Sequence, residues 1–184
     1  VIDAIAHERR VIAFDQPGVG ASTGTVQDTV EAMADDARAF VGALGLDEVD
    51  IVGFSLGGMV AQALALAHPR LVRRLVLAGT GPAGGRGIDA VAGVTYRAMA
   101  RGAITRVDPK EYLFFNRDKE AARDFTNRLQ ERVTDRDTPI TVTALRTQLK
   151  AIKAWGRAEP ADLSRLTAPT LVVNGDHDKM VPTS

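Results

Sequence analysis

The sequence predicts an α/β fold, with a mostly parallel sheet, flanking helices and an inserted helical segment. Segments of helical length separate four short apolar runs: Arg10–Phe14, Val49–Phe54, Leu75–Ala78 and Thr170–Val173. These runs are almost continuously apolar, which is typical of strands buried on both faces of a parallel sheet. Between the second run and the helical segment after it stands Gly53-Phe54-Ser55-Leu56-Gly57, a pattern that indicates a sharp turn from strand to helix.

The first predicted strand, Arg10–Phe14, ends at the turn sequence Asp15-Gln16-Pro17-Gly18. We expect Asp15 and Ser22 to hold the loop after this strand through hydrogen bonds from side chain to backbone. The glycines of this loop do not complete a dinucleotide-binding fingerprint, because Thr23 occupies the position of the third glycine. Nucleotide binding is therefore not expected.

Two helices are expected to flank the second strand. Residues Val26–Leu44 carry apolar side chains at helical spacing, and Gly45 ends the pattern. Residues Met59–Ala67 form an apolar helix that stops before Pro69, because the residue before a proline disfavours the helical conformation. Helices of this length between strands predict parallel pairing through crossover connections.

The long segment between the third and fourth strands breaks this alternation. A glycine-rich stretch opens it, and three helical patterns follow, over Val91–Arg101, Lys119–Val133 and Thr141–Trp155. We expect residues 1–82 and 161–184 to form the core, and residues 83–160 to form a helical cap over the carboxyl edge of the sheet. The insertion holds Tyr96, Tyr112, Phe114, Phe115 and Trp155, which either pack the cap against the sheet or line a pocket; packing is the favoured interpretation.

Ser55 is the candidate nucleophile. In a strand–turn–helix context, Gly-x-Ser-x-Gly holds the serine in a strained turn with its hydroxyl exposed. Gly53 and Gly57 lack Cβ atoms, so strand and helix are expected to approach closely at both positions. The competing interpretation is a glycine-rich turn in which the serine has no chemical role.

Composition narrows the function classes. The chain has 184 residues, a formal net charge of zero and no cysteine. Balanced charge argues against general nucleic-acid binding, and the absence of cysteine excludes disulfides and thiolate metal sites. No apolar run is long enough to span a membrane. We therefore expect a cytoplasmic protein without a metal, a cofactor, or a nucleic-acid or membrane partner.

Four motifs, in order along the chain, resemble those of α/β-hydrolase fold proteins. They are the loop Asp15–Ser22, the turn Gly53–Gly58, the helix end and strand from His68 to Leu77, and the strand and loop from Ala168 to Pro182. The resemblance covers the whole chain and is weakest in the helical insertion. It implies a partial α/β-hydrolase fold.

The resemblance also implies roles for individual residues. Ser55 would attack a carbonyl group, and the backbone N–H of Leu56 would help to bind the resulting oxyanion. Asp178 would orient the histidine that takes the serine proton, with Asp176 as the local alternative. The structural alternative for both aspartates is a turn carboxylate that accepts hydrogen bonds from backbone N–H groups.

None of His7, His68 and His177 is expected to be the catalytic base. In the family the base follows the acid, after one more strand, and a loop ahead of the first motif donates a second oxyanion N–H. We therefore interpret the chain as an internal piece of a longer polypeptide. In the family another strand lies between those that match Arg10–Phe14 and Val49–Phe54, so a further segment or self-association is needed to complete the sheet.

The predicted function is that of a serine hydrolase, acting on a small-molecule ester or related carbonyl compound through an acyl-enzyme. Esterase, lactonase, carbon–carbon bond hydrolase and cofactor-free perhydrolase activities remain open. The alternatives are a non-catalytic ligand-binding or receptor module on the same fold, and a truncated chain without activity. We expect residues 1–184 alone to show little turnover, because the base is not among the three histidines.

Overall fold

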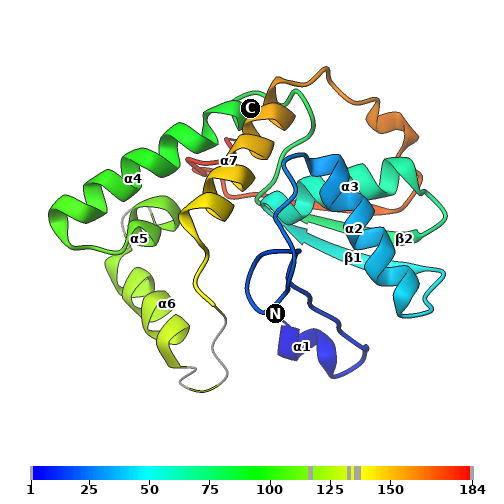
Figure 1. Ribbon diagram of the computed structural model, residues 1–184, viewed down its shortest axis with the longest axis horizontal. Helices are drawn as coiled ribbons and strands as arrows, with labels where there is room; N and C mark the ends of the chain where they lie inside the picture. Colours follow the sequence, from blue (N-terminus) through cyan, green and yellow to red (C-terminus); the bar gives the residue numbers. More distant parts are fainter. Residues whose placement is uncertain (1, 116–117, 132–133, 135–137, 183–184) are drawn as a thin grey trace.

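The computed structural model describes residues 2–115, 118–131, 134 and 138–182. Two parts lie side by side in Figure 1: a small sheet with helices packed on it, and a group of helices from the middle of the sequence. The elements, in chain order, are α1 (Ile2–Ala6), α2 (Val30–Ala43), β1 (Val49–Phe54), α3 (Leu56–Ala67), β2 (Val72–Ala78), η1 (Ile88–Ala90), α4 (Val91–Thr105), α5 (Pro109–Phe114), α6 (Lys119–Glu131), α7 (Val142–Arg157), η2 (Leu163–Arg165) and β3 (Thr170–Val173).

The sheet has three parallel strands in the order β1-β2-β3. β1 pairs with β2 from Val49 to Phe54, and β2 pairs with β3 through its last four residues. The predicted parallel sheet is thus confirmed, as are the bounds of β1 and β3. β2 begins at Val72, three residues before the predicted start.

The core lies between the sheet and the helices α2 and α3. α3 packs on β1 and β2, and α2 packs on α3 (Figure 1). Met33 of α2, Met59 of α3 and Leu75 of β2 are each fully buried there. α2 starts at Val30 rather than Val26, because the Thr29 hydroxyl accepts a hydrogen bond from the N–H of Ala32 and caps the helix.

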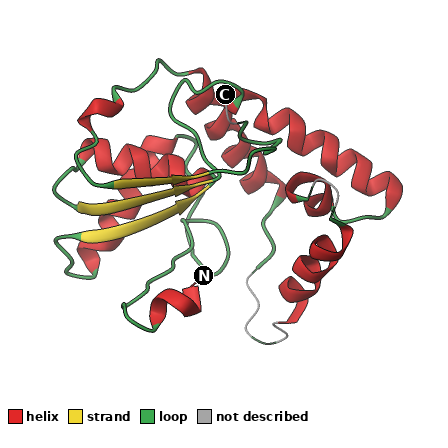
Figure 2. Cartoon of the chain, turned by 180° about the vertical axis from the view of Figure 1, so that it is seen from behind, coloured by secondary structure: helices red, strands yellow, loops and turns green. Residues whose placement is uncertain are grey.

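The inserted helices lie beyond the carboxyl ends of the strands, towards which the strand arrows point in Figure 2. Helices α4, α6 and α7 confirm the three predicted helical patterns, although residues 132–133, at the predicted end of the second, are outside the described part. Helix α5 is additional to the prediction. α7 joins the two parts, since it packs on η1 and α4 and also touches α2. The division into a core and a cap remains a prediction.

The aromatic side chains of the insertion do not form one group. Trp155 is buried in the core, as the favoured interpretation expects. Tyr96 and Phe114 are exposed. The Arg101 guanidinium lies over the Tyr112 ring, with 4.3 Å between Cζ of Arg101 and the ring centre. Phe114 and Phe115 both contact the Phe125 ring of α6.

The prediction of a strand over Arg10–Phe14 is wrong. This segment is irregular and belongs to no described sheet. A strand requires a partner for its backbone groups, and β1 pairs on one side with β2 and has no other described partner. Phe14 stacks instead on the Phe40 ring of α2, with 4.3 Å between the ring centres.

Both edge strands carry exposed apolar side chains. Val52 and Phe54 of β1 are 58% and 65% exposed. In β3, Leu171, Val172 and Val173 are 58%, 64% and 50% exposed. The strand register aligns Val172 with Gly53, which faces α3, whereas the other four side chains lie on the opposite face of the sheet. We call these four residues the apolar sheet surface: Val52, Phe54, Leu171 and Val173. Exposed apolar patches on a sheet are typical of surfaces that another segment or molecule covers.

Candidate active site at the carboxyl edge of the sheet

Ser55 stands at the turn between β1 and α3. Its φ and ψ are 51° and −120°, and Arg106 is the one other non-glycine residue with positive φ in the described part of the chain. Such a conformation is costly for a residue with a Cβ atom and persists only where its surroundings impose it. The Ser55 N–H donates to the carbonyl oxygen of Ala78 at 3.0 Å, so the turn stays attached to β2. The predicted strained turn is confirmed.

Of the two glycines expected to allow close approach of strand and helix, Gly53 does so and Gly57 does not. A Cβ atom on Gly53 would lie 2.6 Å from the carbonyl oxygen of Gly57, so close approach requires glycine there, as expected. At Gly57 the space is open, and the prediction of a tight contact at this residue is wrong. The tight position is Gly58, where a Cβ atom would lie 2.5 Å from Cγ2 of Thr80.

Leu56 is the first residue of α3. N–H groups in the first turn of a helix have no acceptor within the helix and carry the positive end of its dipole. An oxyanion next to Ser55 would therefore meet a donor of the kind that the sequence assigns to Leu56. That assignment stays a prediction.

Asp178 lies in the loop after β3. Its Oδ1 atom accepts hydrogen bonds from the N–H groups of Met180 and Val181, at 2.8 and 3.0 Å. The carboxylate is half-buried and organises the turn that begins at Gly175. This capping role is the structural alternative named above, and it leaves Oδ2 available to a further donor. Asp176 is exposed in the same turn.

Ser55 and Asp178 follow strands on opposite sides of β2, at the same edge of the sheet. Neighbouring strands lie about 4.8 Å apart, so the ends of β1 and β3 are separated by about 10 Å. Asp178 lies five residues beyond the end of β3, so the strand spacing describes the strand ends and not the separation of the two side chains. The sheet thus brings the turns that carry Ser55 and Asp178 to the same edge.

The three histidines lie in different places. His68 is the C-cap of α3, at the opposite end of the strands from Ser55. His7 is exposed and lies two residues from Arg9, which pairs with Asp50 near the start of β1. His177 is next to Asp178 in the turn after β3. The described hydrogen bonds of His68 are to the backbone of Leu64 and Leu71 and do not connect it to Ser55.

Three further side chains organise the site through hydrogen bonds that were not predicted from the sequence. The Thr80 hydroxyl donates to the carbonyl oxygen of Ser55 at 2.7 Å. The carbonyl oxygen of Gly81 accepts from Nε2 of Gln62 at 3.2 Å and from Nε1 of Trp155 at 3.1 Å. A glutamine in an otherwise apolar helix is a usable sequence signal for Gln62, whereas nothing local marks Thr80.

The loop after Phe14 behaves as predicted. Oδ2 of Asp15 accepts a hydrogen bond from the N–H of Ala21, and the Ser22 hydroxyl donates to the carbonyl oxygen of Asp15. Both side chains therefore hold the loop. Within the described residues, no three His, Asp or Glu side chains lie close enough together to hold a metal ion. No described helix is long and apolar enough to cross a membrane.

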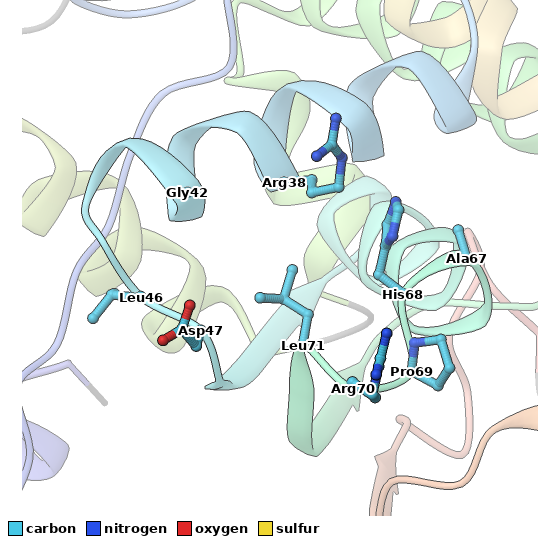
Figure 3. A pocket seen from close by; sticks show the side chains of 9 residues that line it. All are labelled: Arg38, Gly42, Leu46, Asp47, Ala67, His68, Pro69, Arg70 and Leu71. Atoms are coloured by element: carbon cyan, nitrogen blue, oxygen red, sulfur yellow. The ribbon is translucent and has the colours of Figure 1, made fainter.

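A surface pocket of about 500 Å³ lies at the opposite end of the strands from Ser55 (Figure 3). Its wall includes the end of α2 and the turn that joins α3 to β2, with Arg38, His68 and Arg70 among the lining residues. Leu46 and Leu71 supply apolar wall. None of the predicted site residues lines this pocket.

Comparison with known proteins places this arrangement in context. A family profile described as "alpha/beta hydrolase fold" matches residues 1–184. A solved structure described as an alpha/beta hydrolase fold protein from Chitinophaga pinensis superposes with a TM-score of 0.84 and 35% sequence identity. That match covers 92% of this chain and 62% of the other.

Curated relatives match a shorter stretch. The "Putative carbamate hydrolase RutD" of Rhizobium rhizogenes is 38% identical over 78 residues, which are 41% of this chain and 30% of that protein. The 2-hydroxymuconate semialdehyde hydrolase of Pseudomonas sp. strain CF600 is 43% identical over 82 residues, or 44% of this chain and 29% of that protein. The matched part is less than two thirds of each of these three proteins.

Proposed function

Because the chain belongs to the α/β-hydrolase fold family, we propose that it carries the nucleophile and the acid of a serine hydrolase. Ser55 attacks the carbonyl carbon of a small-molecule ester or related compound while a base takes its proton; the bond to the leaving group breaks, and the leaving group departs with that proton. Water then hydrolyses the acyl-enzyme, which releases the acid and restores the Ser55 hydroxyl. The observation that carries the proposal is the strained turn at Ser55, directly before the first residue of α3.

The remaining roles follow from the geometry of this edge. The N–H of Leu56 stabilises the oxyanion, because it stands at the positive end of α3 beside the nucleophile. Asp178 orients the imidazole that takes the Ser55 proton and stabilises its charged form. In this family the base follows the acid along the chain, and all three histidines precede Asp178. The proposal therefore assigns the base to a histidine of the longer polypeptide.

Labelling with a fluorophosphonate tests the nucleophile directly. The reagent phosphonylates the serine oxygen and releases fluoride, and peptide mass spectrometry locates the adduct. In the longer polypeptide we expect the adduct on Ser55, with loss of both labelling and nitrophenyl ester hydrolysis in Ser55→Ala. Ser164→Ala is the matched control, since its hydroxyl contacts Asp162 on the surface. Equal ester hydrolysis by wild type and Ser55→Ala would remove Ser55 from the mechanism.

Carbon–carbon bond hydrolysis is the second candidate. The similarity to the 2-hydroxymuconate semialdehyde hydrolase, 43% over 82 residues, favours it. This reaction also begins at a carbonyl group, so the site described here serves both. Ester and semialdehyde substrates assayed side by side, each with Ser55→Ala, separate the two. A ligand-binding module would bind substrate and turn over neither.

A further inference from the structure

The carbonyl oxygen of Ser55 accepts three hydrogen bonds. Two come from the first turn of α3, from the N–H groups of Gly58 at 2.9 Å and Met59 at 3.3 Å, as expected for the carbonyl before a helix. The third and shortest comes from the Thr80 hydroxyl at 2.7 Å, 25 residues further along the chain. Helix geometry does not require this third bond, so it calls for its own explanation.

Thr80 is held firmly in the position from which it donates. It is 8% exposed, and its Cγ2 atom lies against Gly58, where there is no room for a Cβ atom. The preceding residue, Gly79, has a φ of +53° and donates its N–H to the carbonyl oxygen of Val173 at 2.9 Å. Thr80 is therefore fixed by contacts to α3 on one side and to β3 on the other.

The bond matters because of what the same peptide group presents on its other side. The peptide unit between Ser55 and Leu56 is planar, and in a trans peptide the C=O and N–H groups point in opposite directions. Fixing the Ser55 carbonyl towards Thr80 therefore fixes the direction of the Leu56 N–H, which points away from Thr80. In the proposed function this N–H is the oxyanion donor.

We propose that Thr80 is a positioning residue, which aims the oxyanion-donating N–H of Leu56 through its hydrogen bond to the Ser55 carbonyl. The inference rests on the proposed function, because it gives Thr80 a role in the same reaction. Thr80 itself touches neither substrate nor the reacting atoms. Its effect is expected in the transition state, since the oxyanion forms only there.

Removal of the Thr80 hydroxyl should therefore lower kcat more than it changes KM. Removal of one oxyanion donor typically lowers kcat by about 10²–10³-fold. A donor that is present but misdirected should cost part of this factor. We therefore expect Thr80→Val to lower kcat by about 10–100-fold and to change KM by less than about threefold. The affinity for a boronic acid that fills the oxyanion site should fall in step with kcat.

The test uses the longer polypeptide and four variants. Thr80→Val and Thr80→Ala remove the hydroxyl, and Thr80→Ala keeps the test open if the valine methyl group prevents folding. Thr80→Ser keeps the hydroxyl and should restore kcat to within about threefold of wild type. Thr95→Val is the matched control, because Thr95 is also 8% exposed and its hydroxyl donates to a backbone oxygen, that of Val91 in α4.

The outcomes separate the two proposals. Turnover is expressed per fluorophosphonate-reactive site, so that misfolded protein does not lower kcat. Low kcat in the hydroxyl-free variants, together with near-normal kcat in Thr80→Ser and Thr95→Val, would support the inference. A kcat within twofold of wild type in Thr80→Ala would overturn it, as would equal losses in the Thr80 and Thr95 variants. If Ser55→Ala were as active as wild type, the proposed function would fail first.

Discussion

The indole N–H of Trp155 donates to the carbonyl oxygen of Gly81 at 3.1 Å, and thereby ties α7 to the loop that follows β2. Nε2 of Gln62, in α3, donates to the same oxygen at 3.2 Å. One carbonyl group thus connects the inserted helices to the helix that begins beside Ser55. Because both donors are buried, neither bond is readily replaced by water.

Loss of both donors should cost more than the two single losses together. We expect Trp155→Phe and Gln62→Met each to lower the free energy of unfolding by about 1–2 kcal/mol, because Gly81 keeps one donor in each variant. The double variant leaves a buried carbonyl oxygen without these two partners and should cost about 1 kcal/mol beyond the sum. Urea denaturation followed by circular dichroism measures all four proteins. Strict additivity would show that the two bonds are independent.

Gly58 should resist substitution where Gly57 does not. A Cβ atom on Gly58 meets the buried side chain of Thr80 at 2.5 Å, whereas open space surrounds Gly57. We expect Gly58→Ala to destabilise the protein by about 1–3 kcal/mol. Gly57→Ala should raise the free energy of unfolding by at most about 1 kcal/mol, because alanine is the better helix former.

These two substitutions form their own control, since they add the same methyl group to adjacent residues of one helix. Thermal or urea unfolding of both variants gives the comparison. Equal destabilisation would mean that the helix start itself, and not the contact with Thr80, requires glycine.

Much of the fold could be predicted from the sequence because its signals are local. The apolar runs at β1 and β3 gave the correct bounds, and the Gly-x-Ser-x-Gly pattern gave the strained turn at Ser55. A pattern of five residues holds the information for such a turn.

The errors arise where the deciding contact is distant in sequence. Arg10–Phe14 has the composition of a strand, but a strand forms only beside a partner, and no described segment provides one. Which glycine after Ser55 must be small depends on Thr80, which lies 22 residues beyond Gly58. The role of Thr80 could not be predicted for the same reason.

Asp50 should contribute stability that is lost in acid. Arg73 donates to both of its carboxylate oxygens at 2.8 Å, and Arg9 donates to Oδ2 at 3.0 Å. The hydrogen bonds from Arg73 are the largest cause that holds the pKa of Asp50 below its ordinary value of 3.8. Because the folded-state pKa is lowered, the contribution is complete above pH 3.8 and is lost as the pH falls through the folded-state value.

Asp50→Asn measures this contribution. The group is near the surface, so we expect a loss of at most about 1 kcal/mol at pH 7, which shrinks at high salt. Below the folded-state pKa of Asp50, variant and wild type should have the same stability. The control is Asp28→Asn, whose ion pair with Lys150 is more exposed. A difference between wild type and Asp50→Asn that persists unchanged in acid would contradict the assignment.

Asp178→Asn should separate the capping role from the catalytic role. An asparagine oxygen still accepts the hydrogen bonds of Met180 and Val181, so we expect little change in stability. Without the negative charge, residue 178 no longer orients the imidazole of the base or stabilises its charged form. In the longer polypeptide kcat should therefore fall by about 10³-fold or more. Asp176→Asn is the matched control from the same turn. A larger loss in Asp176→Asn would move the acid to that residue.

The apolar sheet surface should cause association when the chain is isolated. Val52 belongs to an edge strand, and exposed edge strands with apolar side chains pair readily with other molecules. We expect residues 1–184 to form concentration-dependent oligomers in sedimentation velocity, and Val52→Lys to shift them towards monomer. Ile104→Lys is the control, because Ile104 is 84% exposed on α4, outside the apolar sheet surface.

The same pair of variants distinguishes the two ways of completing the sheet. If another segment of the longer polypeptide covers Val52, Val52→Lys there buries a charge and should lower the free energy of unfolding by several kcal/mol. If a second copy covers it instead, the substitution should act mainly on the dimer and make stability less dependent on protein concentration. If Val52→Lys and Ile104→Lys had the same effects on association and on the free energy of unfolding, both in residues 1–184 and in the longer polypeptide, nothing would cover this surface.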